Sequence, residues 1–276
     1  MFFFGKAYNY QNVFNKEIGF MAPKTADGKW VADFDPMFSG GQGGRDYFTE
    51  CNSWVYTFHV QHDVAGLINL FGCKSTFIQK LDSLFSVQFP GYKFEFAKQF
   101  PDQTGLVGMY SQGNEPAFHI PYLYCYAGAP WKTQKIVRQI MNTWFINHPL
   151  GLCGDDDDGS LSSWYLFSAL GFYPVCPGLP VYIIGSPLFK KSTIHLANGK
   201  TFSIIAENNS KKNKYIQSAI LNGKSWEKSW FSHQDLENGG DLILKMGPKP
   251  NKEWGSSEAS FPPSMSLLHP ENSKTI

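Results

Sequence analysis

Glu50 stands in a setting that could support acid catalysis. It lies in residues 48–54 (FTECNSW), where a loop meets the start of a predicted helix. A carboxyl group among aromatic and apolar neighbours suits a general acid, which must hold its proton until the substrate takes it. The alternative is a structural carboxylate in the first helical turn, with Thr49 as the N-cap. The local sequence by itself favours that structural role.

Four adjacent carboxylates, Asp155 to Asp158, precede Gly159 and a predicted helix that contains Trp164. Their mutual repulsion must be relieved by a cation or by proton sharing if the loop folds tightly. An EF-hand does not explain the run, because aligning Gly159 with the loop glycine places Tyr165 where the bidentate glutamate should stand. The alternative is a solvated acidic loop in which an Asp or Ser caps the helix.

Residues 112–116 (QGNEP) place oxygen ligands directly before another predicted helix. The Asn114 amide, the Glu115 carboxylate and the backbone carbonyls of a tight turn suit calcium, a hard cation that prefers oxygen. The alternative is ordinary turn chemistry, with Pro116 at the first helical position. The turn alone favours that alternative.

Several common catalytic motifs are missing from the sequence. No G-x-S-x-G motif occurs, and the glycines at 40–44 lack the Lys-Ser/Thr pair that completes a phosphate-binding loop. His62 and Asp63 are adjacent, but no second histidine follows at metal-ligand spacing. The five cysteines form no C-x-x-C pair, which argues against a zinc knuckle and a thioredoxin-type motif.

Composition restricts the class of protein. A net charge of +1 over 276 residues provides no field toward nucleic acid or an anionic membrane. No apolar run approaches the ~20 residues of a membrane span, and the opening residues MFFFGK are not a signal peptide. We therefore expect either an intracellular protein or a true N-terminus upstream. Aromatic residues make up 16% of the chain, which is typical of a sugar site or of a core with large side chains.

Helical periodicity predicts the elements that position the first three segments. The predicted helices cover 8–14, 51–85 with brief interruptions, 116–127, 131–145 and 160–170. Pro130 occupies a first-turn position of one helix, and Gly171 is the predicted C-cap of another. The long polar loop at 16–46 separates the first two helical regions.

The pattern changes to short strands beyond Pro174. Runs with strand character cover 181–184, 192–196, 201–206, 216–221 and 241–246. Asn198-Gly199 and Asn222-Gly223 are strong hairpin signals, so we predict a small antiparallel β domain. The predicted fold class is α+β. Its parts are a helical region at 1–174, a β domain at 175–260 and a tail at 261–276, expected to be loop or disordered.

Taken in order, short segments of this chain resemble glycoside hydrolase family 92, a calcium-dependent family of secreted bacterial α-mannosidases. The matches run along nearly the whole chain. They are FDP at 34–36, FTE at 48–50, HDVAGLI at 62–68, GNEP at 113–116, YAG at 126–128, PWKT at 130–133, SWY at 163–165, ALGFYP at 169–174, GSPLF at 185–189 and NNS at 208–210.

The resemblance implies a fold and an activity. Members of the family have an N-terminal β-sandwich, an (α/α)6 barrel and a C-terminal β extension. Residues 1–174 would then be the later helices of the barrel, and the missing upstream parts would belong to the same polypeptide. The family removes terminal α-linked mannose from oligosaccharides and N-glycans with inversion, and we expect an α-1,2-type linkage and a periplasmic or extracellular location. The alternative is a catalytically inactive fragment or a carbohydrate-binding remnant.

Carried over residue by residue, the resemblance assigns catalytic roles. Glu50 matches the general acid of the family, Asp157 matches the general base, and Asp155 is a second acidic residue of the same loop. Inversion requires carboxyl groups ~6.5–9.5 Å apart, which leaves room for a water molecule. The family usually has Gly where this chain has Cys51, and it often has His where this chain has Gln112.

The resemblance also assigns ligands and partners. Asn114 and Glu115 match the segment associated with Ca2+, which would bind mannose hydroxyls and help distort the sugar ring. Trp54 and Trp164 either pack against the sugar or support the acidic loops. The expected partners are mannose-containing glycans, with no nucleic acid and no membrane span.

Overall fold

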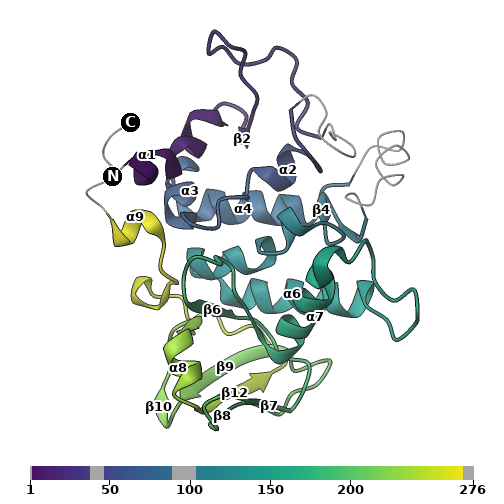
Figure 1. Ribbon diagram of the computed structural model, residues 1–276, viewed down its shortest axis with the longest axis vertical. Coiled ribbons are helices and arrows are strands. Elements are labelled where there is room, and N and C mark those ends of the chain that lie inside the picture. The colour runs from purple at the N-terminus through teal and green to yellow at the C-terminus, as the bar shows by residue number, and fades with distance from the viewer. Residues whose placement is uncertain (1, 38–46, 89–103, 270–276) are drawn as a thin grey trace. The chain divides into compact units, whose positions relative to one another are not determined.

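The computed structural model describes residues 2–37, 47–88 and 104–269, so the glycines at 40–44 and the last part of the predicted tail lie outside the described residues. The chain divides into two compact units (Figure 1). Unit 1 comprises Met1–Ile120, Leu152–Asp157 and Pro263–Ile276, and unit 2 comprises Pro121–Gly151 and Asp158–Pro262.

Unit 1 consists of short helices and two-stranded ribbons. Its elements are α1 (Phe2–Ala7), η1 (Asn9–Val13), β1 (Phe14–Asn15), β2 (Phe20–Met21), α2 (Ser53–Tyr56), α3 (Val64–Leu70), α4 (Lys74–Leu84), β3 (Leu106–Val107), β4 (Tyr110–Ser111), η3 (Glu115–Ala117) and α9 (Met265–Leu268). The helices predicted over 51–85 with brief interruptions are confirmed as α2, α3 and α4, and Val64 and Leu67 of α3 and Phe77 and Leu81 of α4 are fully buried. Ring contacts between Phe58, Phe71 and Phe77 join these helices.

The C-terminal segment of unit 1 is tied to α3 through Asp63. This buried carboxylate accepts hydrogen bonds from the Tyr10 hydroxyl at 2.9 Å, from the Ser264 hydroxyl at 2.9 Å and from the Ser266 amide at 3.0 Å. It also caps α3 by accepting from the Gly66 amide at 3.2 Å. Within the described part of the tail, Met265–Leu268 forms α9, so the expectation of loop or disorder is wrong for these four residues.

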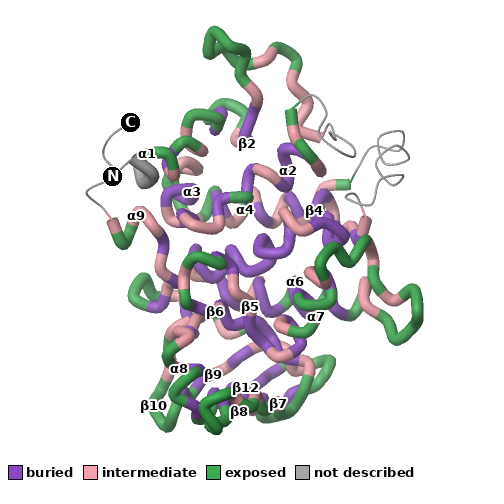
Figure 2. The backbone as a smooth tube through the Cα atoms, in the orientation of Figure 1, coloured by how far each residue is buried: buried purple, intermediate pink, exposed green. Residues whose placement is uncertain are grey.

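Unit 2 combines helices with two sheets. Its elements are η4, which begins at the last residue of unit 1 (Ile120–Ala127), α6 (Pro130–Trp144), α7 (Ser160–Leu170), β5 (Phe172–Tyr173), β6 (Val181–Ile184), β7 (Lys191–His195), β8 (Thr201–Glu207), β9 (Tyr215–Leu221), β10 (Lys224–Ser225), β11 (Trp230–Ser232), α8 (His233–Glu237), β12 (Gly240–Gly247) and η6 (Glu258–Ser260). Figure 2 shows buried residues along much of α6 and exposed residues in turns at the ends of the strands.

Most predicted elements of unit 2 are confirmed. Pro130 opens α6, and Gly171 ends α7 in the left-handed conformation at φ 108°. The segment predicted as a helix at 116–127 is helical, but with 3-10 geometry in η3 and η4. Pro116 and Pro121 supply no backbone N–H, which weakens a regular α-helical ladder there.

The larger sheet has the strand order β10-β9-β12-β8-β7. Both predicted hairpins are present, and Asn222 and Gly223 have the positive φ values, 50° and 77°, that a tight two-residue turn needs. The prediction of an antiparallel β domain is wrong at one pair of strands, because β12 pairs with β8 in parallel. A parallel pair requires a crossover, and the chain makes it by passing through β11 and α8 before β12 enters between β8 and β9.

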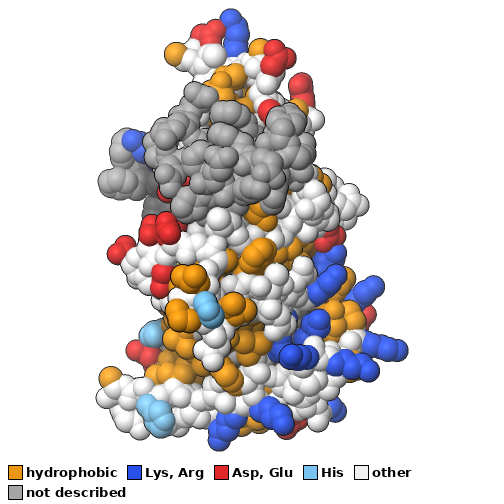
Figure 3. Space-filling view, turned by 90° about the vertical axis from the view of Figure 1, so that its right-hand side faces the viewer, with side chains coloured by type: hydrophobic (Ala, Val, Ile, Leu, Met, Phe, Trp, Pro, Cys, Tyr) orange, Lys and Arg blue, Asp and Glu red, His pale blue; other side chains and the backbone are white. Residues whose placement is uncertain are grey.

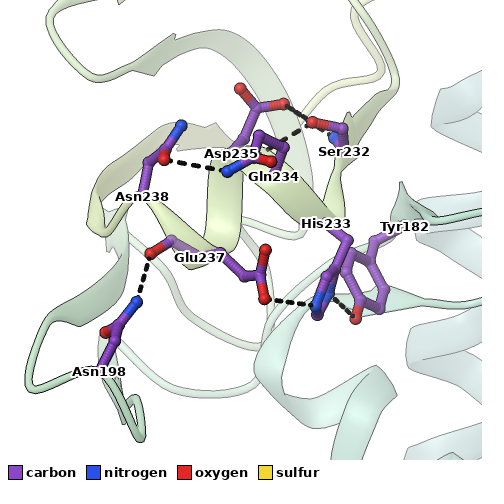
Figure 4. Close-up of polar contacts among 8 residues, drawn as sticks. All are labelled: Tyr182, Asn198, Ser232, His233, Gln234, Asp235, Glu237 and Asn238. Atoms are coloured by element: carbon purple, nitrogen blue, oxygen red, sulfur yellow. Dashed lines mark hydrogen bonds and ion pairs between the residues drawn. The ribbon is translucent and has the colours of Figure 1, made fainter.

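Helix α8 is fixed at its start by a capping box. The Ser232 hydroxyl accepts from the Asp235 amide at 3.1 Å, and the Asp235 carboxylate accepts from the Ser232 amide at 2.8 Å (Figure 4). The Tyr182 hydroxyl and His233 Nδ1 lie 2.9 Å apart, which joins β6 to α8. These contacts position the chain for its entry into β12.

The described helices include none that is long and apolar enough to cross a membrane. The described structure is a mixture of helix and sheet, which agrees with the α+β prediction.

Candidate active site

Glu50 lies half-buried at the end of a loop that leads into α2. The next residue, Cys51, is fully buried and adopts the left-handed conformation at φ 50°. Asn52 then caps α2, because its side chain accepts from the Trp54 amide at 3.1 Å. The suggestion that Thr49 is the cap is therefore wrong. Because Cys51 turns the backbone, Glu50 lies outside the helix and is not a carboxylate of its first turn.

Glu50 is joined to the turn at 112–116 by a direct hydrogen bond. Asn114 Nδ2 donates to Glu50 Oε2 at 3.0 Å. Asn114 is 4% exposed, and its Oδ1 has no hydrogen-bond partner among the described residues. One end of the amide therefore orients the Glu50 carboxylate, while the other end presents an oxygen that still needs a partner.

Gln112 adds a second incomplete polar group to this turn. Its Oε1 accepts from the Tyr110 hydroxyl at 2.6 Å, but its Nε2 has no partner within the described part of the chain. The Gln112 and Gly113 amides donate to Gly105 O and Thr104 O, which fixes the turn. Under the alternative of ordinary turn chemistry, Gln112 Nε2 and Asn114 Oδ1 would stay without partners among the described residues.

The acidic loop begins against this same turn. A Cβ added to Gly154 would lie 2.6 Å from Gly113 O, so the two backbones touch at positions where a side chain would collide. Gly113 directly precedes Asn114, and Gly154 directly precedes Asp155. Asp155 and Asp157 themselves are exposed. Unit 1 thus brings the acid candidate, the candidate calcium turn and the start of the acidic loop together.

The two candidate tryptophans are both buried. Trp54 meets the Phe20 ring edge-on, with centroids 4.8 Å apart, and lies beneath Lys80 Nζ at 4.9 Å. Trp164, in unit 2, is 0% exposed and stacks on Phe145. Of the two predicted roles, both surroundings favour structural support over contact with a sugar.

Lys80 is a residue near the site that sequence reasoning missed. Its Nζ lies over the rings of Phe20 and Trp54, and burial lowers its pKa to about 8. Trp54 lies in α2, four residues after Glu50. Because Lys80 packs over Trp54, it helps to hold in place the helix that follows the acid candidate. No local pattern marks Lys80, because both rings come from distant segments of the chain.

The oxygen atoms of this turn suit a hard cation. Asn114 Oδ1 is a buried acceptor with no partner in the described ranges, and amide oxygens of this kind are common calcium ligands. Among the described residues, no group of three or more His, Cys, Asp and Glu side chains could hold a metal ion. A cation at the turn would therefore depend on the Asn114 amide, backbone carbonyls, the neighbouring Glu115 and oxygens from a bound ligand.

Comparisons with known proteins identify relatives of this chain. Residues 1–248 match the glycosyl hydrolase family 92 catalytic domain. An uncharacterized secreted glycosidase of Arthroderma benhamiae is 32% identical over 288 residues, covering 95% of this chain and 34% of that protein.

Two solved structures from Bacteroides thetaiotaomicron are also similar. A family GH92 α-mannosidase in complex with mannoimidazole is 37% identical with a TM-score of 0.89, and covers 99% of this chain and 36% of that one. A family GH92 inverting mannosidase is 40% identical with a TM-score of 0.81, covering 95% of this chain and 35% of that one. This chain spans about a third of the length of these relatives. It belongs to glycosyl hydrolase family 92.

Proposed function

We propose that this chain forms part of an exo-acting α-mannosidase that hydrolyses terminal α-linked mannose with inversion of configuration. The observation that carries the proposal is the hydrogen bond from Asn114 to Glu50 in a turn that also touches the acidic loop. Similar solved proteins are described as mannosidases, and one of them as inverting. Inverting hydrolysis needs one acid and one base on opposite faces of the sugar ring.

Glu50 serves as the general acid in this proposal. The Asn114 amide donates to Oε2, so the proton for the leaving oxygen is carried on Oε1. The left-handed turn at Cys51 fixes the direction in which the Glu50 side chain leaves the backbone. Proton transfer to the glycosidic oxygen breaks the bond to the neighbouring sugar.

Asp157 serves as the general base, with Asp155 beside it in the same loop. Both side chains are exposed, so a water molecule can reach either carboxylate. The base removes a proton from this water as it attacks the anomeric carbon from the face opposite to the leaving group. The contact between Gly154 and Gly113 fixes the start of the loop that carries both aspartates.

Asn114 Oδ1 and Glu115 are proposed to hold a calcium ion. When bound, calcium would supply a positive charge that binds mannose hydroxyls and favours a distorted ring. Asn114 Oδ1 finds no hydrogen-bond partner in the part of the chain that the structure describes, which supports this assignment. The buried Gln112 Nε2 is a donor and cannot bind a cation, so it would face an acceptor on the sugar.

The substrates are proposed to be mannose-containing oligosaccharides such as N-glycans, with an α-1,2 linkage. A periplasmic or extracellular location is proposed, since one similar protein is described as a secreted glycosidase. The relatives are about three times as long as this chain, so an upstream β-sandwich and earlier barrel helices would complete the enzyme.

A second candidate function is sugar binding without hydrolysis. The rings of Trp54 and Trp164 offer no open face to a sugar in this chain, so the two tryptophans leave the sugar site incomplete. A fragment with an oriented Glu50 but an incomplete sugar site would bind mannose weakly and turn nothing over.

Mannose release from α-linked mannobioses tests both candidates. The wild-type chain, Glu50→Gln and Asp157→Asn are compared with calcium and with a chelator, and calorimetry measures mannose binding in parallel. Calcium-dependent release that falls by about 10²-fold or more in both variants supports the mannosidase. Binding without release supports the second candidate. Release that both variants retain would falsify the assigned roles.

A further inference from the structure

Two loops of unit 2 carry a cluster of lysines that the proposed hydrolysis does not use. We define the lysine surface by its five members, Lys190, Lys191, Lys211, Lys212 and Lys214. Residues 186–191 lead into β7, and residues 208–214 connect β8 to β9. Neither segment contains Asp or Glu, and the nearest acidic residue along the chain is the exposed Glu207 at the end of β8.

The two loops are held together as one rigid piece. Asn209 is buried, and its Nδ2 donates to Pro187 O, Leu188 O and Phe189 O at 3.0–3.1 Å. Within the second loop, the Asn213 amide donates to Ser210 Oγ at 3.0 Å. These hydrogen bonds hold the two backbone segments that carry the lysines together before any ligand binds, which reduces the backbone entropy lost on binding.

Arg138 places a further positive charge beneath this surface. It is 3% exposed, and its guanidinium donates to Pro187 O, to Asn209 Oδ1 and to Ser210 O. All three acceptors are neutral, and Arg138 Nε has no partner among the described residues. Burial lowers the pKa of Arg138, but an arginine starts so high that it keeps its charge. No described carboxylate therefore balances the charge under the loops.

The lysines themselves are also unbalanced. Within the residues that the structure describes, none of the five is paired with a carboxylate. Unit 2 as a whole carries fourteen Lys and Arg residues against eight Asp and Glu residues. Lys and Arg side chains gather over the strand-containing part of one face in Figure 3. A fixed cluster of unpaired positive charges favours a ligand with several negative charges.

Protection of the sheet edge explains only part of this cluster. β7 is an edge strand of the larger sheet, and a lysine such as Lys191 discourages pairing with another strand. Lys211, Lys212 and Lys214 lie on no strand, so edge protection does not account for them.

We propose that the lysine surface binds an anionic polysaccharide that carries sulfate or phosphate groups. The choice of a polysaccharide over other polyanions rests on the proposed function, in which the substrate is a glycan. Phe189 directly precedes Lys190 and Lys191 in the first loop and is 50% exposed, so its ring can pack against the C–H face of a sugar. Such a surface would keep the chain on a charged polymer while a separate site acts on mannose.

The test measures the binding of the full chain to dextran sulfate and to neutral dextran at several salt concentrations. It uses no hydrolysis, so its outcome is independent of whether mannose is released. The variant Lys211→Gln/Lys212→Gln removes two charges of the lysine surface. The matched control Lys200→Gln/Lys224→Gln removes two exposed lysines near the opposite ends of the strands.

We expect salt-sensitive binding to dextran sulfate and none to neutral dextran. The loop variant should bind dextran sulfate roughly tenfold more weakly or worse. The slope of its log binding constant against log salt concentration should be less steep by about two, because two lysines are removed. The control should bind like the wild type, and thermal unfolding should show that both variants fold.

Equal losses in the loop variant and in the control would overturn the proposal, because overall charge would then explain binding. Equal binding to neutral dextran would also overturn it. Binding to phosphatidylserine vesicles without binding to dextran sulfate would assign the surface to a membrane instead.

Discussion

Asn114 Nδ2 and Glu50 Oε2 form a hydrogen bond of 3.0 Å across 64 positions of sequence. The opposite end of the same amide, Oδ1, is buried without a partner among the described residues. One side chain therefore links the orientation of a candidate acid to a candidate cation ligand. The two roles can be separated by substitution, since one needs a donor and the other needs an oxygen.

Asn114→Asp keeps an oxygen for a cation but removes the donor to Glu50, whereas Asn114→Ala removes both. We expect both variants to lower kcat by about 10- to 100-fold, which corresponds to one lost hydrogen bond to a charged group. Only Asn114→Asp should still respond to added calcium. Turnover measured against calcium concentration checks this prediction, with Asn198→Ala as a control at an exposed asparagine. A calcium response retained by Asn114→Ala would remove Asn114 from the cation site.

The backbone at Cys51 adopts the left-handed conformation, which favours glycine. A residue with φ 50° is strained unless it is glycine, by roughly 1–2 kcal/mol. Cys51→Gly relieves this strain but loses a small buried side chain, so we expect the free energy of unfolding to change by less than about 1 kcal/mol. Cys51→Val should destabilise by about 2 kcal/mol or more, because branching at Cβ is poorly tolerated in the left-handed region.

Urea unfolding of wild type, Cys51→Gly and Cys51→Val measures these differences. The two substitutions differ in backbone freedom, so their order is the informative result. If Cys51→Gly proves the less stable of the two, packing of the thiol governs this position and the backbone strain does not.

The sequence predicted the regular elements better than the contacts between them. α6, α7 and the Asn222-Gly223 hairpin follow from periodicity and turn chemistry within a few residues. The parallel pairing of β12 with β8 could not be predicted, because it depends on where the chain returns after α8. Local patterns describe neighbours in sequence and carry no information about such a return.

In the candidate site, too, the residue types could be predicted from the sequence, whereas the contacts between them could not. The residue types at Glu50 and Asn114 were identified from the family pattern, yet local reasoning favoured a helix carboxylate and an ordinary turn. Their hydrogen bond is set by packing between segments far apart in the chain. The left-handed backbone of Cys51 and the position of Lys80 over two rings likewise depend on tertiary structure.

The Asp63 carboxylate joins three parts of unit 1 by hydrogen bonds, so its removal should destabilise the contacts between them. Asp63→Asn keeps the size of the side chain but turns one acceptor oxygen into a donor that faces other donors. We expect a loss of about 2–4 kcal/mol in the free energy of unfolding, because buried hydrogen-bonding groups are left unsatisfied. Tyr10→Phe and Ser264→Ala each remove one donor and should cost about 1 kcal/mol.

Chemical denaturation of the three variants checks this order. Limited proteolysis adds a local measurement, since Asp63→Asn should expose the chain near Ser264 before global unfolding. An Asp63→Asn variant as stable as the wild type would show that these contacts add nothing to the fold.

Lys80 predicts how stability depends on pH. An unfolded lysine keeps its proton up to a pKa near 10.5, whereas burial lowers the pKa of Lys80 to about 8 in the folded chain. Between these values the unfolded state binds more protons, so the free energy of unfolding should rise with pH from about 8. The buried Tyr10, with its raised pKa, opposes this rise once unfolded tyrosines ionise near pH 10. The informative window is therefore about pH 7 to 9.5.

Across this window, the free energy of unfolding of the wild type, measured with urea, should rise with pH relative to that of Lys80→Met. Burial raises the pKa of Cys125 to about 12 and that of Cys153 to about 11, so these thiols lower both curves alike as unfolded cysteines ionise. Methionine keeps the apolar stem over Phe20 and Trp54 but carries no charge, so the two proteins differ mainly in the titrating group. Lys16→Met, at an exposed lysine, should keep the wild-type slope. If Lys80→Met rises as steeply as the wild type, the Lys80 ammonium is well hydrated and the two rings do not hold it away from water.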